Sequence, residues 1–565
     1  MKLKHLIFVL LLAALLRFAF LGSIPAGFTP DEASQGYTAY SLLATGQDEW
    51  GLSWPLTSFR SFFDYKAPLQ TYLIIPSVAI FGLNAFAVRL PSALFGLLAV
   101  LATYLLTRQL FGDKQVKLGR FSTSLPVLAA FFLAISPWHL QFSRMALEVN
   151  LSSFLFPFGF YLFLRGLKEK KFSFFIFTAL LWGLNLYSYH AAKMFTPLIA
   201  LALLFIYRRQ LLKFDFRQLL PAGLVFLLFL VPAFTSTIFG EAGARGGDLL
   251  ISNLSLEQIQ AISQAQYLSP LNQISPWLSR IFHNKLWFTL DLFLENYVSY
   301  FTPSFWFTEG GREITYSIIP GRGLLYLWQL PLVILGLVNL IVSSNKKTKQ
   351  AGLLFLIWAL LAALPAALTK EGYRPNRAGS FALLWEMIAA VGLIYLLSLL
   401  PKKIKSWFVL AFSGLVLVCF VFYLEDYALA SPIKFPASLS YGYQQLVAKL
   451  DRYDEDNHII IDRGNQSQAY VAFYHQIDPV TFQSFSHIWW LRFKDTDLLY
   501  LDMMDDYSLL NYRFKTVSLP SDLEQADTIV AIPADKMRED YQSQVIDQVD
   551  YPDRTPAFYL LQSYD

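Results

Sequence analysis

KLKHLIFVLLLAALLRFAFLG, residues 2–22, is followed after a short gap by FTPDEA, residues 28–33. The first segment is apolar and long enough to cross a bilayer as a helix. Asp31 and Glu32 belong to the second segment. Carboxylates at a membrane surface are costly to desolvate and add nothing to an apolar core. They can accept a proton from a hydroxyl or an amine. The stretch therefore predicts a membrane-embedded chain with a chemically active acidic pair at the bilayer face.

The composition indicates the same class of protein. The chain has 565 residues, of which 55% are hydrophobic, 17% are aromatic and 15% are charged. Soluble domains carry about 25% charged residues, and abundant aromatic residues are typical of membrane belts. The net charge of +4 gives little support to nucleic-acid binding. The single cysteine, Cys419, excludes a disulfide within the chain and a thiolate metal site.

The basic N-terminus followed by an apolar run has two interpretations. It could be a secretory signal, but the run extends to about Leu21 without an evident small-residue cleavage motif. We therefore expect an uncleaved first helix.

Eleven hydrophobic stretches are predicted to span the membrane. They are 3–22, 86–107, 123–138, 147–165, 172–188, 191–207, 219–238, 322–342, 351–369, 379–399 and 405–424. If the N-terminus lies inside, the inner loops are the ones rich in Lys and Arg, as the positive-inside rule requires. These loops are 108–120, 165–171, 208–217, 346–349 and 402–405. The topology places the N-terminus in the cytoplasm and residues 425–565 outside, at the plasma (inner) membrane.

Three predicted outer segments are more than connectors. The first, 23–85, holds the acidic pair, a helical stretch at 34–43 and an apolar run to Phe81, which we expect in or near the outer interface. The second, 239–321, begins Gly-rich and becomes amphipathic and aromatic from Trp287 to Phe307. Both belong to a predicted membrane domain over residues 1–424.

The third outer segment, 425–565, changes in composition. Acidic residues become frequent, and the runs 458–461 and 528–532 are typical of short buried strands. Residues 443–450 and 466–474 are predicted helices. Alternating strands and helices predict a small α/β domain that is large enough for its own core.

Asp31 and Glu32 are the strongest candidate catalytic residues. Acidic residues after Pro30 also suit the first turn of a helix as capping residues, and both interpretations can hold together. We expect Asp31 to act as the general base. Glu32 is expected to orient the acceptor or to modulate Asp31 by like-charge repulsion.

Several cations lie in the predicted outer segments, where positive charge is less expected than inside. We interpret five of them as candidate contacts for a phosphate leaving group, because a cation stabilises charge that develops on such a group. They are Lys66, Arg144, Lys193, Arg374 and Arg377. The alternatives are snorkelling or interfacial anchoring and, for Arg144, a helical pair with Glu148. Candidate substrate contacts beside them are Tyr65, His139 and His190; a lone His is more often structural.

The order of these features resembles the GT-C superfamily of glycosyltransferases. The nearest branch is that of the protein O-mannosyltransferases and the aminoarabinose transferases of lipid A (glycosyltransferase family 39/83-like). The resemblance covers roughly residues 1–400. It rests on the acidic pair after the first helix, on Lys66-Ala67-Pro68-Leu69, on Arg89-Leu90-Pro91-Ser92-Ala93-Leu94, and on a C-terminal outer domain. Ala67 stands where the family often has Pro.

The resemblance implies a GT-C fold and sugar transfer from a polyprenyl-phosphate sugar to a protein, lipid or cell-envelope glycan at the outer face. It implies Asp31 as the base of one inverting step and Lys66 as a contact to the donor phosphate. Some relatives bind a divalent metal, and the sequence shows no convincing ligand set.

The main alternative is a polytopic transporter or lipid flippase. Such proteins place paired charges at mid-membrane and often carry internal repeats. In this chain Glu386 is the clearest acid within a predicted span, and polar groups gather in the outer loops instead. A membrane scaffold is a further alternative, but it would not need an acidic pair in the first loop.

Overall fold

The computed structural model describes most of the chain and divides it into two compact units. The described residues are 2–113, 115–118, 121–240, 243, 247, 250–271, 274–311, 319, 321–370, 372–453, 458–494, 496, 498 and 500–563. The first unit comprises Met1–Val9, Ala99–Trp138 and Ser152–Leu410, and the second comprises Leu10–Leu98, His139–Leu151 and Ala411–Asp565.

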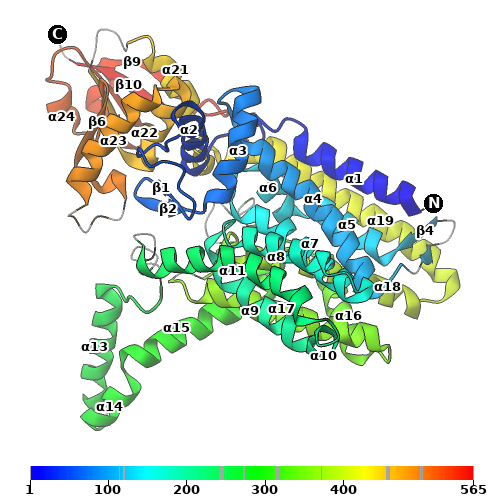
Figure 1. Ribbon diagram of the computed structural model, residues 1–565. Helices are drawn as coiled ribbons and strands as arrows, with labels where there is room; N and C mark the ends of the chain where they lie inside the picture. The colour runs from blue at the N-terminus through cyan, green and yellow to red at the C-terminus, as the bar shows by residue number, and fades with distance from the viewer. Residues whose placement is uncertain are drawn as a thin grey trace. The chain divides into compact units, whose positions relative to one another are not determined.

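Each of the eleven predicted spans falls on a helix (Figure 1). The helices concerned are α1 (Lys2–Phe18), α4 (Ala85–Phe111), α5 (Leu125–Ile135) with α6 (Pro137–Arg144), α7 (Val149–Glu169), α8 (Ser173–Asn185), α9 (His190–Ile206), α11 (Phe216–Phe239), α16 (Gln329–Val342), α17 (Lys346–Ala367), α18 (Leu384–Leu399) and α19 (Lys402–Glu425). The short helix α10 (Arg208–Leu211) and the strand β3 (Gln115–Leu118) lie in predicted inner loops, and β4 (Phe121–Ser124), which pairs with β3, extends into the start of the predicted span 123–138.

Five helical segments of the described residues are long and apolar enough to cross a membrane. They are Ala85–Phe111, Phe216–Phe239, Lys346–Ala367, Arg377–Leu399 and Lys402–Lys434, and a sixth arises if α5 and α6, bent by 59°, form one broken span. The chain is therefore a polytopic membrane protein. The count of eleven stays a prediction, because α8, α9 and α16 are apolar but shorter.

Helices α16 and α18 show how small residues allow close packing in the first unit. A Cβ atom added to Gly336 would lie 2.2 Å from the carbonyl oxygen of Ile388, and one added to Gly392 would lie 1.8 Å from that of Leu332. No side chain fits at such distances. The two glycines therefore let the helix backbones approach, as is common between membrane helices.

The remaining helices of the first unit form the predicted second outer segment. They are α13 (Leu256–Leu271), α14 (Pro276–Phe282), α15 (Lys285–Ser299) and a π-helical turn, η1 (Ser304–Thr308). The predicted amphipathic stretch from Trp287 to Phe307 corresponds to most of α15 and to η1. A short 3-10 helix, η2 (Arg377–Phe381), precedes α18.

The first outer segment is well structured and lies in the second unit. It contains α2 (Pro30–Thr45), a hairpin of β1 (Phe59–Ser61) and β2 (Asp64–Lys66), and α3 (Pro68–Phe81). Thr29 is the N-cap of α2 and forms a capping box with Glu32, while Gly46 ends the helix in a left-handed conformation. The predicted helix over 34–43 is confirmed. The interfacial location of α3 stays a prediction.

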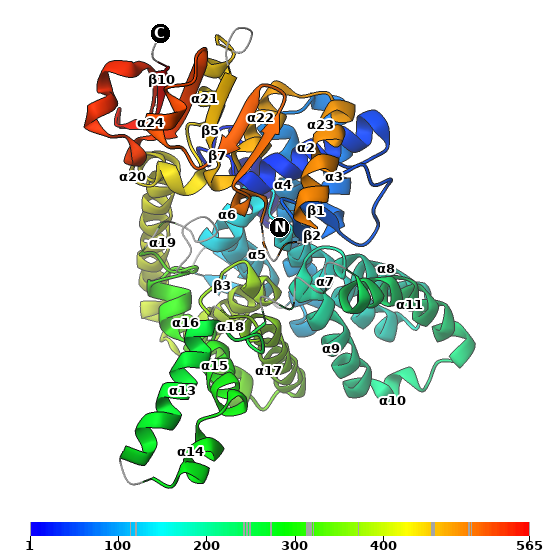
Figure 2. The same ribbon diagram turned by 90° about the vertical axis from the view of Figure 1, so that its left-hand side faces the viewer.

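The C-terminal segment contains the predicted α/β domain (Figure 2). Six strands form a mixed sheet in the order β6-β7-β5-β8-β10-β9, with β5 parallel to both β7 and β8. The strands are β5 (His458–Asp462), β6 (Asp506–Leu509), β7 (Tyr512–Lys515), β8 (Thr528–Pro533), β9 (Val545–Asp550) and β10 (Pro556–Gln562). The helices are α20 (Ser431–Lys434), α21 (Tyr443–Leu450), α22 (Ser467–His475), α23 (Pro479–Phe493) and α24 (Leu519–Asp522). Both predicted strands and both predicted helices are present.

The sheet domain and the first outer segment share one hydrophobic core within the second unit. The hydroxyl of Tyr37 donates to the carbonyl of Ile477 at 2.8 Å, and that of Tyr470 donates to the carbonyl of Phe28 at 2.9 Å. A Cβ atom on Gly36 would lie 2.7 Å from the ring of Phe473, so α2 lies close against α22. The predicted domain boundary at residues 424/425 stays a prediction.

Candidate functional site

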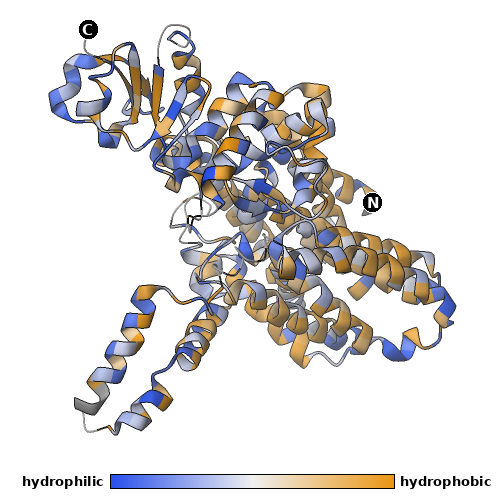
Figure 3. Cartoon of the chain, turned by 60° about the vertical axis from the view of Figure 1, so that its left-hand side comes forward, coloured by the Kyte–Doolittle hydropathy of each residue, from blue (hydrophilic) through white to orange (hydrophobic). Residues whose placement is uncertain are grey.

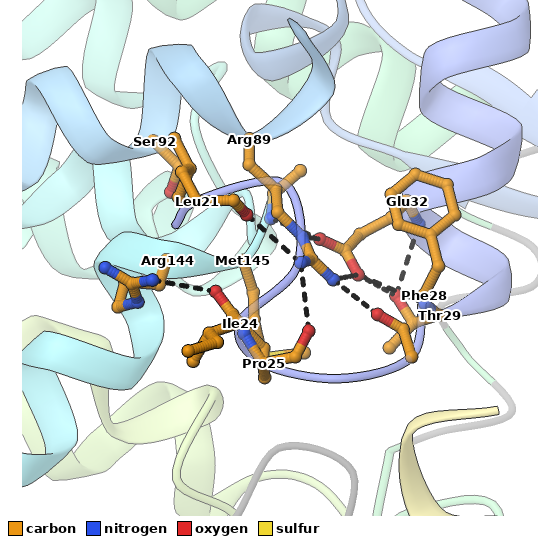
Figure 4. A network of polar contacts seen from close by, with 12 residues as sticks. Leu21, Ile24, Pro25, Phe28, Thr29, Glu32, Arg89, Ser92, Arg144 and Met145 are labelled. Carbon is orange, nitrogen blue, oxygen red and sulfur yellow. Dashed lines mark hydrogen bonds and ion pairs between the residues drawn. The ribbon is translucent and has the colours of Figure 1, made fainter. Parts of the chain in front are cut away.

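The side chain of Glu32 is the centre of a buried polar network (Figure 4). It is fully buried, and its Oε1 accepts from Nε of Arg89 at 2.8 Å and from the backbone N–H of Ala146 at 3.1 Å. Its Oε2 accepts from Nη2 of Arg89 at 3.2 Å and from the backbone N–H of Thr29 at 3.1 Å. With the hydroxyl of Thr29, which donates to Oε2 at 3.3 Å, five donors on three separate segments converge on one carboxylate.

Arg89 extends this network to the turn that follows α1. Its guanidinium donates to the carbonyl oxygens of Leu21, Pro25 and Gly27 at 3.3, 3.1 and 2.7 Å (Figure 4). Bidentate, charge-assisted contacts of this kind fix geometry as well as charge. The carboxylate of Glu32 is inaccessible to solvent, and both of its oxygens accept hydrogen bonds from the protein. These bonds hold the start of α2 in place.

We expect loss of either partner of this pair to destabilise the second unit. Arg89→Ala leaves Glu32 buried without its cation, and such a loss costs about 3–5 kcal/mol. Chemical unfolding of the purified protein in detergent measures the change. The matched control is Arg538→Ala, which removes an exposed pair with Asp540 and costs about 0–1 kcal/mol. Equal effects of the two substitutions would contradict this assignment.

Asp31, the neighbour of Glu32, is placed quite differently. Its Oδ1 lies 3.0 Å from Nζ of Lys66, and the two side chains keep 19% and 17% of their surface accessible. The same ammonium contacts Oδ2 of Asp64 at 3.1 Å. The structure therefore brings together Asp31 and Lys66, which the sequence analysis singled out separately. Tyr65, between Asp64 and Lys66 on β2, is half-buried, and its N–H donates to Asp64.

Glu148 joins this cluster as a third carboxylate. Its Oε2 accepts from the backbone N–H of Ala67 at 3.3 Å, and its Oε1 is buried without a hydrogen-bond partner among the described residues. The carboxyl group is buried, and the charges of Lys66, Asp31 and Asp64 all act on it. Sequence reasoning considered Glu148 only as a partner for Arg144. Local sequence carried no signal for its contact with Ala67, because the two residues are 81 positions apart.

The carboxylate of Glu49 links α2 to the hairpin that carries Lys66. Oε1 of Glu49 accepts from Oγ of Ser34 at 3.0 Å, and that hydroxyl lies 2.8 Å from Oγ of Ser61 on β1. Burial, reinforced by the adjacent Asp48, raises the pKa of Glu49 to about 8. The chain Glu49–Ser34–Ser61 thus ties the helix of Asp31 to the hairpin of Lys66.

The raised pKa of Glu49 predicts a pH dependence of stability. The folded protein holds a proton that the unfolded chain releases above about pH 4.3. Glu49 therefore stabilises the fold most below that pH, and this contribution is lost as the pH rises through about 8. Glu49→Gln keeps an acceptor for Ser34 but does not titrate. We expect its thermal midpoint to fall less than that of wild type between pH 5 and 8.5, and parallel curves would refute the prediction.

Arg144 and His139 are buried in the second unit. The Nη atoms of Arg144 donate to the carbonyl oxygens of Leu16, Ala19 and Ile24 at 2.5, 2.7 and 2.9 Å. Nδ1 of His139 lies 2.9 Å from Nη2 of Arg17. Glu148 accepts from Ala67 instead of forming the helical pair with Arg144 that the sequence left open. These contacts fix the end of α1, and a substrate role for either residue stays a prediction.

The other predicted cations lie in the first unit. Nζ of Lys193, near the start of α9, lies 3.3 Å from Oγ1 of Thr237, and Nη1 of Arg377 donates to Oγ1 of Thr369 at 2.5 Å. The backbone N–H of Arg374 faces the hydroxyl of Tyr300 at 3.4 Å. His190 is the exposed first residue of α9. Helix α9 contacts η2, so this unit places Lys193 and Arg377 on neighbouring elements.

Among the described residues, no group of three or more His, Cys, Asp or Glu side chains is arranged to hold a metal ion. The three carboxylates around Lys66 share their space with its ammonium group.

Comparison with known proteins gives a family match over part of the chain and a similar fold over nearly all of it. The profile of the family described as dolichyl-phosphate-mannose-protein mannosyltransferase matches residues 65–235. A search of curated proteins found no match. The fold is similar to that of ArnT from Cupriavidus metallidurans bound to undecaprenyl phosphate, at 13% identity and a TM-score of 0.51, over 98% of this chain and 97% of that one.

A second solved structure is an oligosaccharyltransferase from Archaeoglobus fulgidus tethered to an acceptor peptide. It matches at 15% identity and a TM-score of 0.47, over 84% of this chain and 63% of that one. The family match and the shared fold confirm the expected resemblance to the GT-C superfamily. The chain thus has a segment, residues 65–235, that is similar to the mannosyltransferase family, and a fold similar to that of ArnT.

Proposed function

We propose that this protein transfers a sugar from a polyprenyl-phosphate donor to an acceptor at the outer face of the plasma membrane. The acceptor is a protein, a lipid or a cell-envelope glycan. In this proposal the N-terminus is cytoplasmic, and the sheet domain and the Asp31–Lys66 pair face outward. The family match and the ArnT-like fold support the reaction type, and undecaprenyl phosphate is the ligand of that ArnT structure.

One observation carries the proposal for the site. Asp31 and Lys66, 35 positions apart in the sequence (66 − 31), meet at 3.0 Å and keep nearly a fifth of each side chain accessible. Glu32 beside them is inaccessible and holds α2 in place. An accessible carboxylate and an accessible ammonium on a rigid support are the groups that glycosyl transfer from a lipid phosphate needs.

The proposed reaction is a single displacement. The Asp31 carboxylate takes the proton of the acceptor hydroxyl or amine, whose freed electron pair attacks the anomeric carbon. The bond between that carbon and the phosphate oxygen breaks, its electrons leave with the polyprenyl phosphate, and the anomeric configuration inverts. The transition state resembles an oxocarbenium ion. Lys66 then lies beside the negative charge that develops on the phosphate.

Asp31→Asn tests this role. The substitution keeps the size of the side chain but removes the base, so we expect transfer to fall by about 100- to 10,000-fold. The measurement uses purified protein in lipid, a panel of radiolabelled polyprenyl-phosphate sugars and a cell-envelope extract as the acceptor source. Asp64→Asn is the matched control, because Asp64 also contacts Lys66 but is more exposed, at 37%. It should retain most activity.

The outcomes of this experiment separate the alternatives. Equal transfer by wild type and Asp31→Asn would remove Asp31 from the mechanism. Movement of the labelled lipid across the bilayer without release of its sugar would favour the flippase alternative. The labelled donor that reacts also identifies the sugar.

The cations of the first unit are the proposed partners of the donor phosphate. A charge-assisted contact is worth about 1.5–3 kcal/mol, so Arg377→Ala should weaken binding of polyprenyl phosphate by about 10-fold or more. Lys370→Ala, in the same loop, is the control and should have little effect. Competition with labelled polyprenyl phosphate on the protein in nanodiscs measures both. Equal loss in the two variants would indicate nonspecific attraction.

A further inference from the structure

Helix α15 carries an apolar stripe that no part of the described chain covers. Leu286, Leu290, Leu294 and Val298 are exposed by 73%, 39%, 49% and 57%. They are spaced four residues apart, and with about 100° per residue they lie on one side of the helix. Trp287 extends the same side and is exposed by 49%. Single exposed apolar residues are ordinary, whereas a continuous stripe marks an interaction surface.

The stripe has a charged border. Asp291 and Glu295 follow Leu290 and Leu294 by one position each, and both are exposed. Each is therefore displaced by about 100° around the helix from a leucine of the stripe. The opposite side of α15 contains the buried residues Asn296 and Ser299. The helix thus has an inner polar side, an exposed apolar side and an acidic edge.

The C-terminal end of α15 is fixed to a helix that meets the criteria for a membrane span. The hydroxyl of Tyr297 donates to the carbonyl of Leu360 in α17 at 2.9 Å, and Nδ2 of Asn296 donates to the carbonyl of Thr369 at 2.8 Å. Leu360 lies seven residues before Ala367, the last residue of α17 (367 − 360), which is about 10 Å along the helix axis. The end of α15 therefore lies near the C-terminal end of this span, which is its outer end in the proposed orientation of the chain.

The hairpin preceding this anchor has the composition of a membrane interface. Helices α13 and α15 are joined through α14 (Figures 1 and 2), and apolar residues recur along this part of the chain (Figure 3). Trp277 and Phe282 of α14 are each exposed by 63%. In the sequence, Arg280 lies between these two residues and Lys285 follows them. Exposed Trp beside cations is typical of segments at the headgroup level.

We propose that α15 is a monotopic helix that lies in the outer leaflet, with the Leu286–Val298 stripe in the acyl chains and the acidic edge toward water. The occupant of the stripe is lipid because α15 is hydrogen-bonded at Leu360 to α17, a helix apolar enough to cross a membrane, which exposes Leu353, Leu356 and Leu360 by 51%, 56% and 41%. Another protein chain would have to reach the same stripe beside a membrane span. The proposal is independent of the sugar and of the acceptor.

Site-directed spin labelling in lipid nanodiscs tests the proposal on the full chain. Cys419, the single native cysteine, is first replaced by Ser. Separate Cys substitutions then place a nitroxide at Leu290 or Leu294, and the matched controls place it at Asp291 or Glu295. Power saturation with oxygen, which partitions into lipid, and with a water-soluble nickel chelate reports the surroundings of each label. Sugar transfer by each labelled protein shows that it is folded.

At the two leucine positions we expect oxygen accessibility to exceed nickel accessibility at least several-fold, with the reverse order at the two acidic positions. Nickel accessibility that is equally high at all four positions would overturn the proposal, since the stripe would then face water. Protection of the leucine labels from both reagents would also overturn it, because that pattern indicates a covering protein surface.

Discussion

The buried ion pair of Glu32 and Arg89 is the constraint on which the site depends. Moving two charges out of water is expensive, and the cost is repaid only where hydrogen bonds satisfy both groups. Here backbone donors from the start of α2 and from Ala146 meet the carboxylate, and carbonyls of the turn after α1 meet the guanidinium. Three segments distant in sequence are thereby fixed to one another, and the rest of the site is built on α2.

Two adjacent acidic residues consequently have different surroundings. Consecutive positions on a helix point about 100° apart, so burying Glu32 turns Asp31 toward the accessible side. Lys66 approaches Asp31 from a hairpin that is tied to α2 through Glu49, Ser34 and Ser61. Within one helical turn, Glu32 thus supplies a buried carboxylate that anchors the helix, and Asp31 supplies an accessible carboxylate.

Much of this arrangement could be predicted from local sequence. Apolar length indicated the helices, and the acidic residues after Pro30 indicated the first turn of α2, because capping is a local interaction. The strands at 458–461 and 528–532 were equally clear. The roles of Arg89 and Glu148 in the structure were not predictable from local sequence. Arg89 contacts Glu32 across 57 positions, and Glu148 contacts Ala67 across 81 positions. For the same reason, sequence could pair neither Asp31 with Lys66 nor Glu49 with Ser34.

The shared core of the first outer segment and the sheet domain has a consequence for biosynthesis. The hydrogen bond between Tyr470 and Phe28 joins residues 442 positions apart. The first segment is made before the sheet domain and can bury its apolar side only after that domain has been translated. Until then Phe28 and Tyr37 lack their native neighbours, and exposed apolar surface of this kind promotes aggregation. Folding of the first outer segment therefore has to wait until the sheet domain has been synthesised.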